Sequence, residues 1–403
     1  MEFRSKRNHS AKALAMQRLG INGILLAIAY ASIETVWPMF LSEFFSTSSQ
    51  VGFFTAFIAV CSFISLLGGY QLFRKYPAKT LLFFAVTVNA IAVSLFAVTK
   101  NVTILIILAI INSAFVAIRI QAFSLLVRQN SSLKTINKNE NLIYLFGNIG
   151  WVLGPLVAGF FADELSVRAV LMFAALFLLF SVYSITFSTK ELRKEQITAM
   201  KHISPIKNLK DYFKKKKSFV GYLLSAGLEV WWVIPFIFLP LEIIRQGLSF
   251  SIIGVFLFLL GIPLIIVEYF MKNKINSNLR RLIGYGYLFA FVLGIIAAFT
   301  NNIYVSMGCF VIASFGLGFV EPSVESFFFS TVNREEAQRY YGAFFTSKTV
   351  GGFFGKLLIA IILLYLPLKF GILFVSLTVL GLGVLALKIK KNNKYNHKKI
   401  TSS

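Results

Sequence analysis

Cysteine and histidine are scarce in this sequence of 403 residues, and their positions limit the chemistry that it can support. The two cysteines, Cys61 and Cys309, both lie inside apolar segments, which excludes a disulfide scaffold and a CxxC metal or redox motif. The three histidines, His9, His202 and His397, fall in polar, basic stretches, so the apolar segments contain no histidine for a metal site or a proton relay. We therefore expect neither a metal nor a cofactor.

Charge is also scarce, and acidic side chains more so than basic ones. Charged residues make up 14% of the chain and hydrophobic residues 57%, whereas soluble domains carry about 25% and about 45–50%. This composition excludes an ordinary water-soluble domain. The sequence contains no HExxH, P-loop or GxSxG motif, which argues against a polytopic membrane enzyme and against a nucleotide-driven pump.

Long apolar stretches are abundant instead. They approach the ~20 residues that a helix needs to cross ~30 Å of hydrocarbon. The first stretch follows five basic residues, is too long for a signal-peptide core and lacks a small-residue cleavage site, so we expect it to remain as a span. The sequence therefore predicts an all-α integral membrane protein with twelve transmembrane helices at about 19–42, 50–72, 80–99, 102–127, 141–162, 168–188, 219–241, 249–271, 282–300, 303–330, 341–366 and 368–388.

The net charge of +24 is distributed unevenly between these stretches. Of the 40 Lys and Arg residues, 33 lie on the side of both termini, 4 lie in the loops of the other side and 3 lie within spans. Cytoplasmic loops are enriched in Lys and Arg, so this bias predicts a multi-pass protein of the plasma membrane with both termini cytoplasmic. The basic runs are interpreted as solvated loops near anionic headgroups of the lipid bilayer, and we expect no nucleic-acid partner.

The longest polar connection, which includes Lys214–Lys217, divides the chain into two halves of six spans each. Five segments follow from this division: a cytoplasmic N-terminus (1–18), an N-terminal six-helix bundle (19–188), a cytoplasmic basic linker (189–218), a C-terminal six-helix bundle (219–388) and a cytoplasmic tail (389–403).

The two halves resemble each other. A shift of 201 residues places Gly150-x-x-x-Gly154 on Gly351-x-x-x-Gly355 and Ser113 on Ser314. Parallel repeats of this kind, related by an axis along the membrane normal, are typical of transporters built from two pseudo-symmetric bundles.

Two local motifs lie near the cytoplasmic half of the first bundle. Between spans 2 and 3, Gly69 is followed by Phe73-Arg74, and in span 4 Arg119-Ile-Gln121 places a cation and an amide near the middle of a helix. The first is similar to a gating motif of glycine and Asp-Arg in a transporter family, with Phe73 at the aspartate position. The second is similar to an arginine and glutamine that the same family places in its fourth helix.

A third motif lies in span 5, where Gly150-x-x-x-Gly154-Pro155 is followed by Gly159. Glycines four residues apart let two helices approach closely, and Pro155 removes a backbone donor and permits a bend. Packing is the simple interpretation; the functional one adds that the bend closes one side of a cavity. With the six-plus-six arrangement, these motifs resemble the major facilitator superfamily, and the third resembles that of its drug:proton antiporters.

Carboxylates within spans are the strongest functional signal, because an ionised group at the bilayer centre costs about 2.5–3.5 kcal/mol or more unless it is paired or hydrated. Glu34 in span 1 lies beside Trp37 and Pro38, and Glu229 occupies the related place in span 7. An apolar setting disfavours the charged form, so such a carboxylate can load and release a proton. Proton coupling is one hypothesis for Glu34; a structural hydrogen-bond acceptor, or a group in the outer vestibule, is the other.

Glu321 and Glu325 are four residues apart and share one helical face. They are also proton-coupling candidates, but two carboxylates on one face need a proton or a cation between them. Arg119 in span 4 and Lys348 in span 11 are the candidate partners, and a structural salt bridge is the alternative interpretation for each pair. Lys356, which replaces a proline in the repeat, is not counted among the candidates.

Aromatic and polar side chains near these charges complete a predicted substrate cavity. Aromatic rings beside a carboxylate suit an organic cation or an amphipathic ligand, although tryptophan also anchors helices at the membrane interface. The cavity candidates are Trp37, Asn112, Arg119, Gln121, Tyr144, Trp231, Trp232 and Lys348.

The leading hypothesis is a monomeric secondary transporter that alternates access between its two bundles and binds a small-molecule substrate near the midplane. Its favoured form is proton-coupled export of a small lipophilic or cationic compound. An importer or facilitator of a polar metabolite, such as a sugar, an amino acid or an organic ion, and a transporter-like receptor or scaffold without flux are the alternatives.

Overall fold

The computed structural model describes residues 2–69, 71–130, 136–188, 205–271, 278–332 and 334–389, and these ranges are almost entirely helical. The elements are α1 (Glu2–Ser42), α2 (Ser48–Gly69), η1 (Leu72–Arg74), α3 (Ala78–Val98), α4 (Val102–Gln129), α5 (Ile136–Glu164), α6 (Val167–Ser188), α8 (Pro205–Phe213), α9 (Lys216–Val233), η2 (Ile234–Phe238), α10 (Leu239–Arg245), α11 (Phe250–Met271), α12 (Leu279–Phe299), α13 (Ile303–Thr331), α14 (Arg334–Tyr365) and α15 (Leu368–Lys388).

The twelve predicted spans fold as twelve helical rods, one of which is the continuous segment α9–η2–α10. In that rod Pro235 lies in the π-helical turn η2, where the proline lacks the N–H of a regular helix. Eleven helices in the described ranges are long and apolar enough to cross a membrane, and α5, with 29 residues, is the twelfth rod. The predicted all-α membrane fold is confirmed.

The outer surface of the rods is apolar. On α6 the side chains of Met172, Leu176, Phe180 and Tyr183 are all exposed, and their spacing places them on one helical face. Soluble monomers rarely expose an apolar stripe of this length, because water disfavours it. Hydrocarbon is the environment that such a face requires, so this side of α6 contacts lipid.

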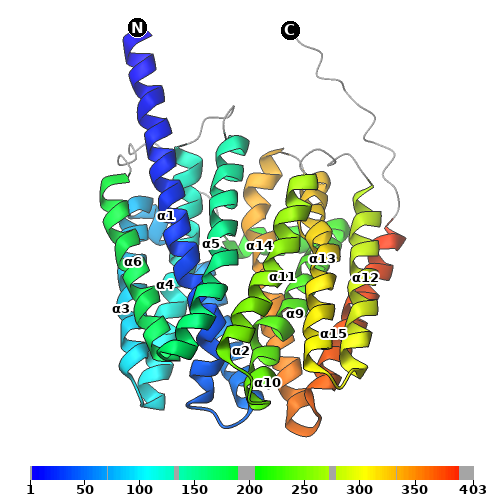
Figure 1. The fold of residues 1–403 in the computed structure, drawn as a ribbon. Coiled ribbons are helices and arrows are strands. Elements are labelled where there is room, and N and C mark those ends of the chain that lie inside the picture. The colour runs from blue at the N-terminus through cyan, green and yellow to red at the C-terminus, as the bar shows by residue number, and fades with distance from the viewer. Residues whose placement is uncertain are drawn as a thin grey trace.

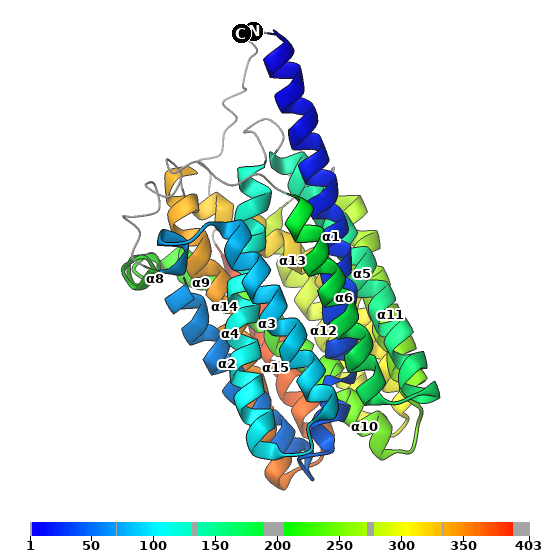
Figure 2. The same cartoon turned by 90° about the vertical axis from the view of Figure 1, so that its left-hand side faces the viewer.

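The start of α1 and the end of α15 lie toward the same end of the molecule (Figures 1 and 2). The end at which α1 begins and α15 finishes is called the terminal end below, and the other the opposite end. Helices α1–α6 form one bundle, and α9–α15 form the other, on the other side of Figure 1. The turns after α1, α3, α5, α10, α12 and α14 all lie at the opposite end.

The repeated glycines pack equivalent helix pairs in the two bundles. A Cβ atom on Gly150 would lie 2.6 Å from the Cβ of Ala27 on α1, and one on Gly154 would lie 2.6 Å from that of Ala31. In the second bundle, a Cβ on Gly351 would lie 2.1 Å from the carbonyl oxygen of Ala226 on α9. The absence of side chains therefore lets α5 contact α1 closely, and α14 contact α9 in the same way.

Two contacts join the bundles toward the opposite end. Gly159 of α5 approaches α11 so closely that an added Cβ would lie 2.8 Å from the Cα of Gly254. At the start of α2, the hydroxyl of Ser49 donates a hydrogen bond of 2.7 Å to the carbonyl oxygen of Ala360 on α14. Together with the Asp163 contact described next, these form what is called the clamp.

Asp163 of α5 caps the N-terminus of α11. Its carboxylate accepts hydrogen bonds of 2.8 Å from the backbone N–H groups of Phe250 and Ser251, and another from the Ser251 hydroxyl. Burial alone would raise the pKa of this carboxyl, but the hydrogen bonds from Ser251 and Phe250 hold it below its ordinary value. The ionised form of Asp163 thus favours the closed clamp, since the free N–H groups of a helix N-terminus attract negative charge.

Residues 189–204 of the predicted linker lie outside the described ranges. The rest of the linker contains helix α8, which the sequence analysis did not predict. Helix α8 lies against α9 and α14 near the terminal end (Figure 2). Arg339 of α14 donates a hydrogen bond of 2.7 Å to Asn208, and Lys215 pairs with Glu336 at 2.5 Å. The end of the linker is therefore attached to the helix that carries Lys348 and Lys356.

Gly150→Val is expected to destabilise the first bundle, because the added side chain meets the backbone and Cβ of α1. Overpacking of this kind costs about 1–3 kcal/mol. The apparent melting temperature in detergent should fall, as followed by tryptophan fluorescence. Gly147→Val is the matched control, because Gly147 has no neighbour within 4 Å of an added Cβ. Equal melting temperatures for the two variants would contradict this account of α5 packing.

Candidate functional site

A cavity of about 750 Å³ lies between the two bundles. Its lining comes from α1, α2, α4 and α5 of the first bundle and from α9, η2, α11, α13 and α14 of the second. Helices α3, α6, α12 and α15 contribute no residue of the lining within the described ranges. The volume falls in the range of about 300–1,000 Å³ that is usual for small-ligand sites.

The walls combine apolar and aromatic side chains with charges of both signs. The charged residues of the lining are Glu34, Glu229, Glu321, Lys348 and Lys356. A second hollow of about 480 Å³, between α11 and α13, is lined mainly by apolar side chains and contains no charged residue among its described lining. The central cavity is thus the place where the described structure gathers its intramembrane charges.

Three of these charges form a triad on the second bundle. The Nζ of Lys348 lies 2.9 Å from Glu321 Oε1 and 3.9 Å from Glu229 Oε1. The three side chains come from α14, α13 and α9, and each is only partly buried because each faces the cavity. Lys348 therefore supplies the cation that the two carboxylates need.

Arg119, the other partner predicted for Glu321 and Glu325, lies elsewhere. Its guanidinium carbon is 3.9 Å from the centre of the Tyr30 ring, a cation–π contact between α4 and α1. The Tyr30 hydroxyl donates to Asn89 at 2.8 Å, and Asn89 donates to the side chain of Asn112 at 2.9 Å. Tyr30 and Asn112 line the cavity, whereas Arg119 supports the wall from behind and is not part of the lining.

Glu34 and Lys356 face the cavity without a protein partner. Glu34 of α1 is exposed, Lys356 of α14 is half-buried, and neither makes a hydrogen bond or an ion pair within the described part of the chain. They are near enough for their charges to interact across the cavity. The sequence analysis did not count Lys356 as a site residue, although it noted the signal that marks it, a charge at the position where the repeat has a proline.

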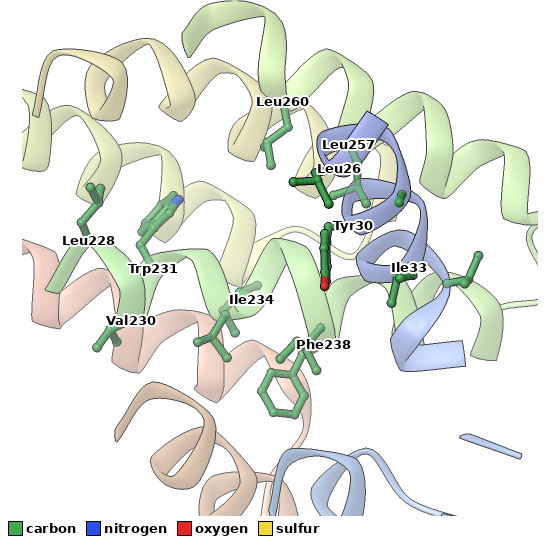
Figure 3. Close-up of a cluster of buried hydrophobic side chains, with 14 of the residues drawn as sticks. Leu26, Tyr30, Ile33, Leu228, Val230, Trp231, Ile234, Phe238, Leu257 and Leu260 are labelled. Carbon is green, nitrogen blue, oxygen red and sulfur yellow. The ribbon is translucent and has the colours of Figure 1, made fainter. Parts of the chain in front are cut away.

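Trp231 lies outside the cavity, contrary to the prediction. Its side chain is 1% exposed, and its ring centre lies 5.1 Å from that of Phe310 on α13. Figure 3 shows Trp231 with Leu228 on α9, within the buried hydrophobic cluster. Adjacent helical positions point about 100° apart, and of the two tryptophans only Trp232 is part of the cavity lining.

Two other candidates also lie outside the lining. Gln121 donates a hydrogen bond of 2.8 Å to the carbonyl oxygen of Leu66, joining α4 to α2. Glu325 accepts one of 2.8 Å from the hydroxyl of Tyr341, one turn nearer the terminal end than Glu321. The side chain of Tyr144 lies outside the described residues. Trp37 and Pro155 are part of the lining.

The described residues of the motif between α2 and α3 form no ion pair with the rest of the described chain. Gly69 is buried, and a Cβ added to it would lie 3.5 Å from the side chain of Ile118. Phe73 is also buried, whereas Arg74 is exposed and has no ion-pair partner among the described residues. The aspartate position of the motif has thus become a hydrophobic contact.

Comparison with known proteins identifies the family to which this architecture belongs. Residues 19–356 match the profile described as the Major Facilitator Superfamily. The chain belongs to this superfamily. The resemblance inferred from the glycine and arginine motifs is confirmed, and the protein is a transporter and not an enzyme.

Relatives and solved structures agree with this assignment. The quinolone resistance protein NorA of Staphylococcus aureus (strain COL) is 23% identical over 345 residues, which are 84% of this chain and 87% of NorA. A POT family transporter in complex with a thioalcohol-conjugated peptide has a TM-score of 0.77 at 10% identity, covering 92% of this chain and 95% of that one. The nucleoside transporter NupG has a TM-score of 0.69 at 15% identity, covering 93% and 97%. These two solved structures share the fold of this chain.

Lys348→Gln is expected to destabilise this superfamily member more at pH 8 than at pH 5. Without the ammonium group, the carboxylates of Glu229 and Glu321 repel each other when both are ionised, and low pH relieves that repulsion. A loss on the order of 1–2 kcal/mol at pH 8 lies between the values for exposed and buried pairs. Thermal unfolding in detergent at the two pH values measures it, with Lys348→Arg as the control that keeps the charge. A loss independent of pH would contradict the triad.

Proposed function

We propose that this superfamily member exports a small lipophilic or cationic compound in exchange for protons. The observation that carries the proposal is the set of three carboxylates, on both bundles, that reach one cavity with largely apolar walls. Glu34 is central, because its carboxylate faces the cavity and has no partner among the residues that the structure describes. Membrane-embedded carboxylates of this kind are typical of proton relays in transporters.

Exchange follows if a proton and a positively charged substrate compete for the same carboxylate. Protonated Glu34 has no charge to attract a cation, and cation-bound Glu34 has no affinity for a proton. Each half-cycle then carries one of the two species across, and the proton gradient drives the other outward. The 23% identity to NorA, a quinolone resistance protein, supports the export direction.

The side on which the cavity opens follows from the clamp and from the charge bias. We infer that the terminal end is cytoplasmic, because 33 of the 40 Lys and Arg residues lie on that side. The clamp of Gly159, Asp163 and Ser49 holds the bundles together at the opposite end, so the cavity opens toward the cytoplasm in this state. The cavity is complete within one chain, which supports a monomer in the plasma membrane.

Glu34→Gln is expected to abolish substrate-dependent proton movement, because an amide cannot carry the proton. Proteoliposomes with an internal pH-sensitive dye measure it while ethidium, other lipophilic cations, sugars and amino acids are added in turn. Glu164→Gln is the control, since Glu164 is exposed at the end of α5, away from the cavity. If Glu34→Gln leaves proton movement unchanged, Glu34 does not carry the proton, and Glu229 or Glu321 becomes the candidate carrier.

Asp163→Asn is expected to loosen the clamp, because an amide cannot accept all the hydrogen bonds that the carboxylate accepts from the start of α11. The reporter is a cysteine in place of Ser62, which lines the cavity, in a chain with Cys61→Ser and Cys309→Ser. A membrane-impermeant maleimide added from the opposite side should label it several-fold faster than in the chain with native Asp163. Low pH on that side should act in the same direction, because it neutralises the same carboxylate; the lowered pKa of Asp163 requires a more acidic solution than an ordinary aspartate needs.

Glu164→Gln again serves as the control for this labelling experiment, since it changes the neighbouring acid without touching α11. Equal labelling rates in Asp163→Asn and Glu164→Gln would mean that the capping contact does not hold the opposite end closed.

A further inference from the structure

We propose that Glu34 and Lys356 form a two-point site for a zwitterionic ligand, with Glu34 taking its ammonium group and Lys356 taking its carboxylate or another anionic group. This inference rests on the proposed function, because it names the substrate class of the same cavity. It differs from a site for simple lipophilic cations, which would have no use for Lys356.

The charged side chains of the cavity differ in whether they have a partner within the described protein. Lys348 is satisfied by two carboxylates at 2.9 and 3.9 Å, so the triad needs no ligand. Glu34 and Lys356 form no ion pair within the described ranges, so the carboxylate oxygens of Glu34 and the Nζ of Lys356 are more than 4.0 Å apart. An unpaired charge within a membrane protein is costly unless water or a ligand solvates it. The pair therefore has unused capacity for one anion and one cation.

The position of Lys356 separates it from Lys348, whereas Glu229 of the triad is near enough for its charge to interact with that of Lys356. Lys356 is eight residues beyond Lys348 on α14, which corresponds to about 12 Å along the helix at 1.5 Å per residue. Lys356 thus lies nearer the opposite end, as does Glu34 in the second half of α1. A cavity of about 750 Å³ has room for a ligand between them while the triad stays intact.

The walls around this pair suit the apolar body of such a ligand. Trp37 lies one turn from Glu34, and its ring is held by Phe96, with ring centres 5.1 Å apart. Trp232 and Phe236 line the side of the second bundle, with ring centres 6.0 Å apart. Aromatic faces favour both an apolar body and a nearby ammonium group. The expected ligand is a small aromatic or aliphatic molecule with separated charges of opposite sign.

The pair also connects ligand binding to the movement of the bundles. Glu34 belongs to the first bundle and Lys356 to the second, so a ligand that contacts both bridges them at the end that the clamp closes. A singly charged ligand contacts only one of the two. Zwitterion binding therefore stabilises the bundle arrangement in which both groups reach the ligand.

The test measures binding to the full-length protein in lipid nanodiscs by titration calorimetry. The probes are 4-(aminomethyl)benzoate, its cationic analogue 4-(aminomethyl)benzamide and its anionic analogue 4-(acetamidomethyl)benzoate, together with the same three compounds on a longer biphenyl spacer. For at least one spacer, the zwitterion should bind about tenfold or more tightly than either singly charged analogue, since it makes both charge-assisted contacts.

Variants then assign each contact. Lys356→Gln should abolish the preference for the zwitterion over the cationic analogue, while binding of the cationic analogue stays within about twofold, which also shows that the variant is folded. Glu34→Gln should weaken the binding of the zwitterion and of the cationic analogue and leave the affinity for the anionic analogue unchanged. Lys356→Arg keeps the preference, and Lys100→Gln, which changes an exposed loop lysine, leaves all affinities unchanged.

Three outcomes overturn the proposal: equal binding of the three members of each set, binding of none, or a zwitterion preference that survives Lys356→Gln. The proposed function fails separately, through the absence of ethidium-dependent proton movement in proteoliposomes of the native chain. If the zwitterion is preferred but ethidium causes no proton movement, the two-point site stands and the proton-coupled export of cations is wrong. If ethidium causes proton movement but the zwitterion is not preferred, export stands and the two-point site is wrong.

Discussion

Hydrocarbon surrounds the twelve rods of this protein, and the cost of an ionised side chain in hydrocarbon determines where its charges lie. The backbone N–H and C=O groups form hydrogen bonds within each helix, so the charged side chains are the groups that still need a polar environment. Glu34, Glu229, Glu321, Lys348 and Lys356 come from four helical rods, and all of them face one cavity. The outer helices expose apolar side chains instead, as the stripe on α6 illustrates. The cavity is therefore the one region in which charges of both signs approach each other inside the membrane part of the described structure.

Glycine determines how closely the rods that carry these charges can approach. Gly150 and Gly154 pack α5 on α1, and Gly351 packs α14 on α9, so each bundle brings a charged helix against its partner by the same contact. The contact of Gly159 with Gly254 is different, because it joins the two bundles. Contacts within a bundle are permanent in a rocking transporter, whereas contacts between bundles must open and close. One stretch of α5 thus serves both purposes.

The fold alone does not select a solute. Solved transporters of peptides and of a nucleoside share it with TM-scores of 0.77 and 0.69, although only 10% and 15% of their residues are identical to this chain. Selectivity resides in the few side chains that face the cavity. Here these include two lysines on α14, one of which is paired and one of which is not.

The sequence by itself determined the twelve spans, the superfamily and the paired glycine motifs, because the thickness of the bilayer and the close approach of helices act on local stretches of chain. It also indicated the carboxylates that reach the cavity. Only the tertiary structure decided that Trp232 and not Trp231 faces inward, that Lys348 and not Arg119 pairs with Glu321, and that Lys356 reaches the cavity. These outcomes depend on the rotation of each helix about its axis and on neighbours more than a hundred residues away in the sequence, as with Glu229 and Lys348, which local periodicity does not specify.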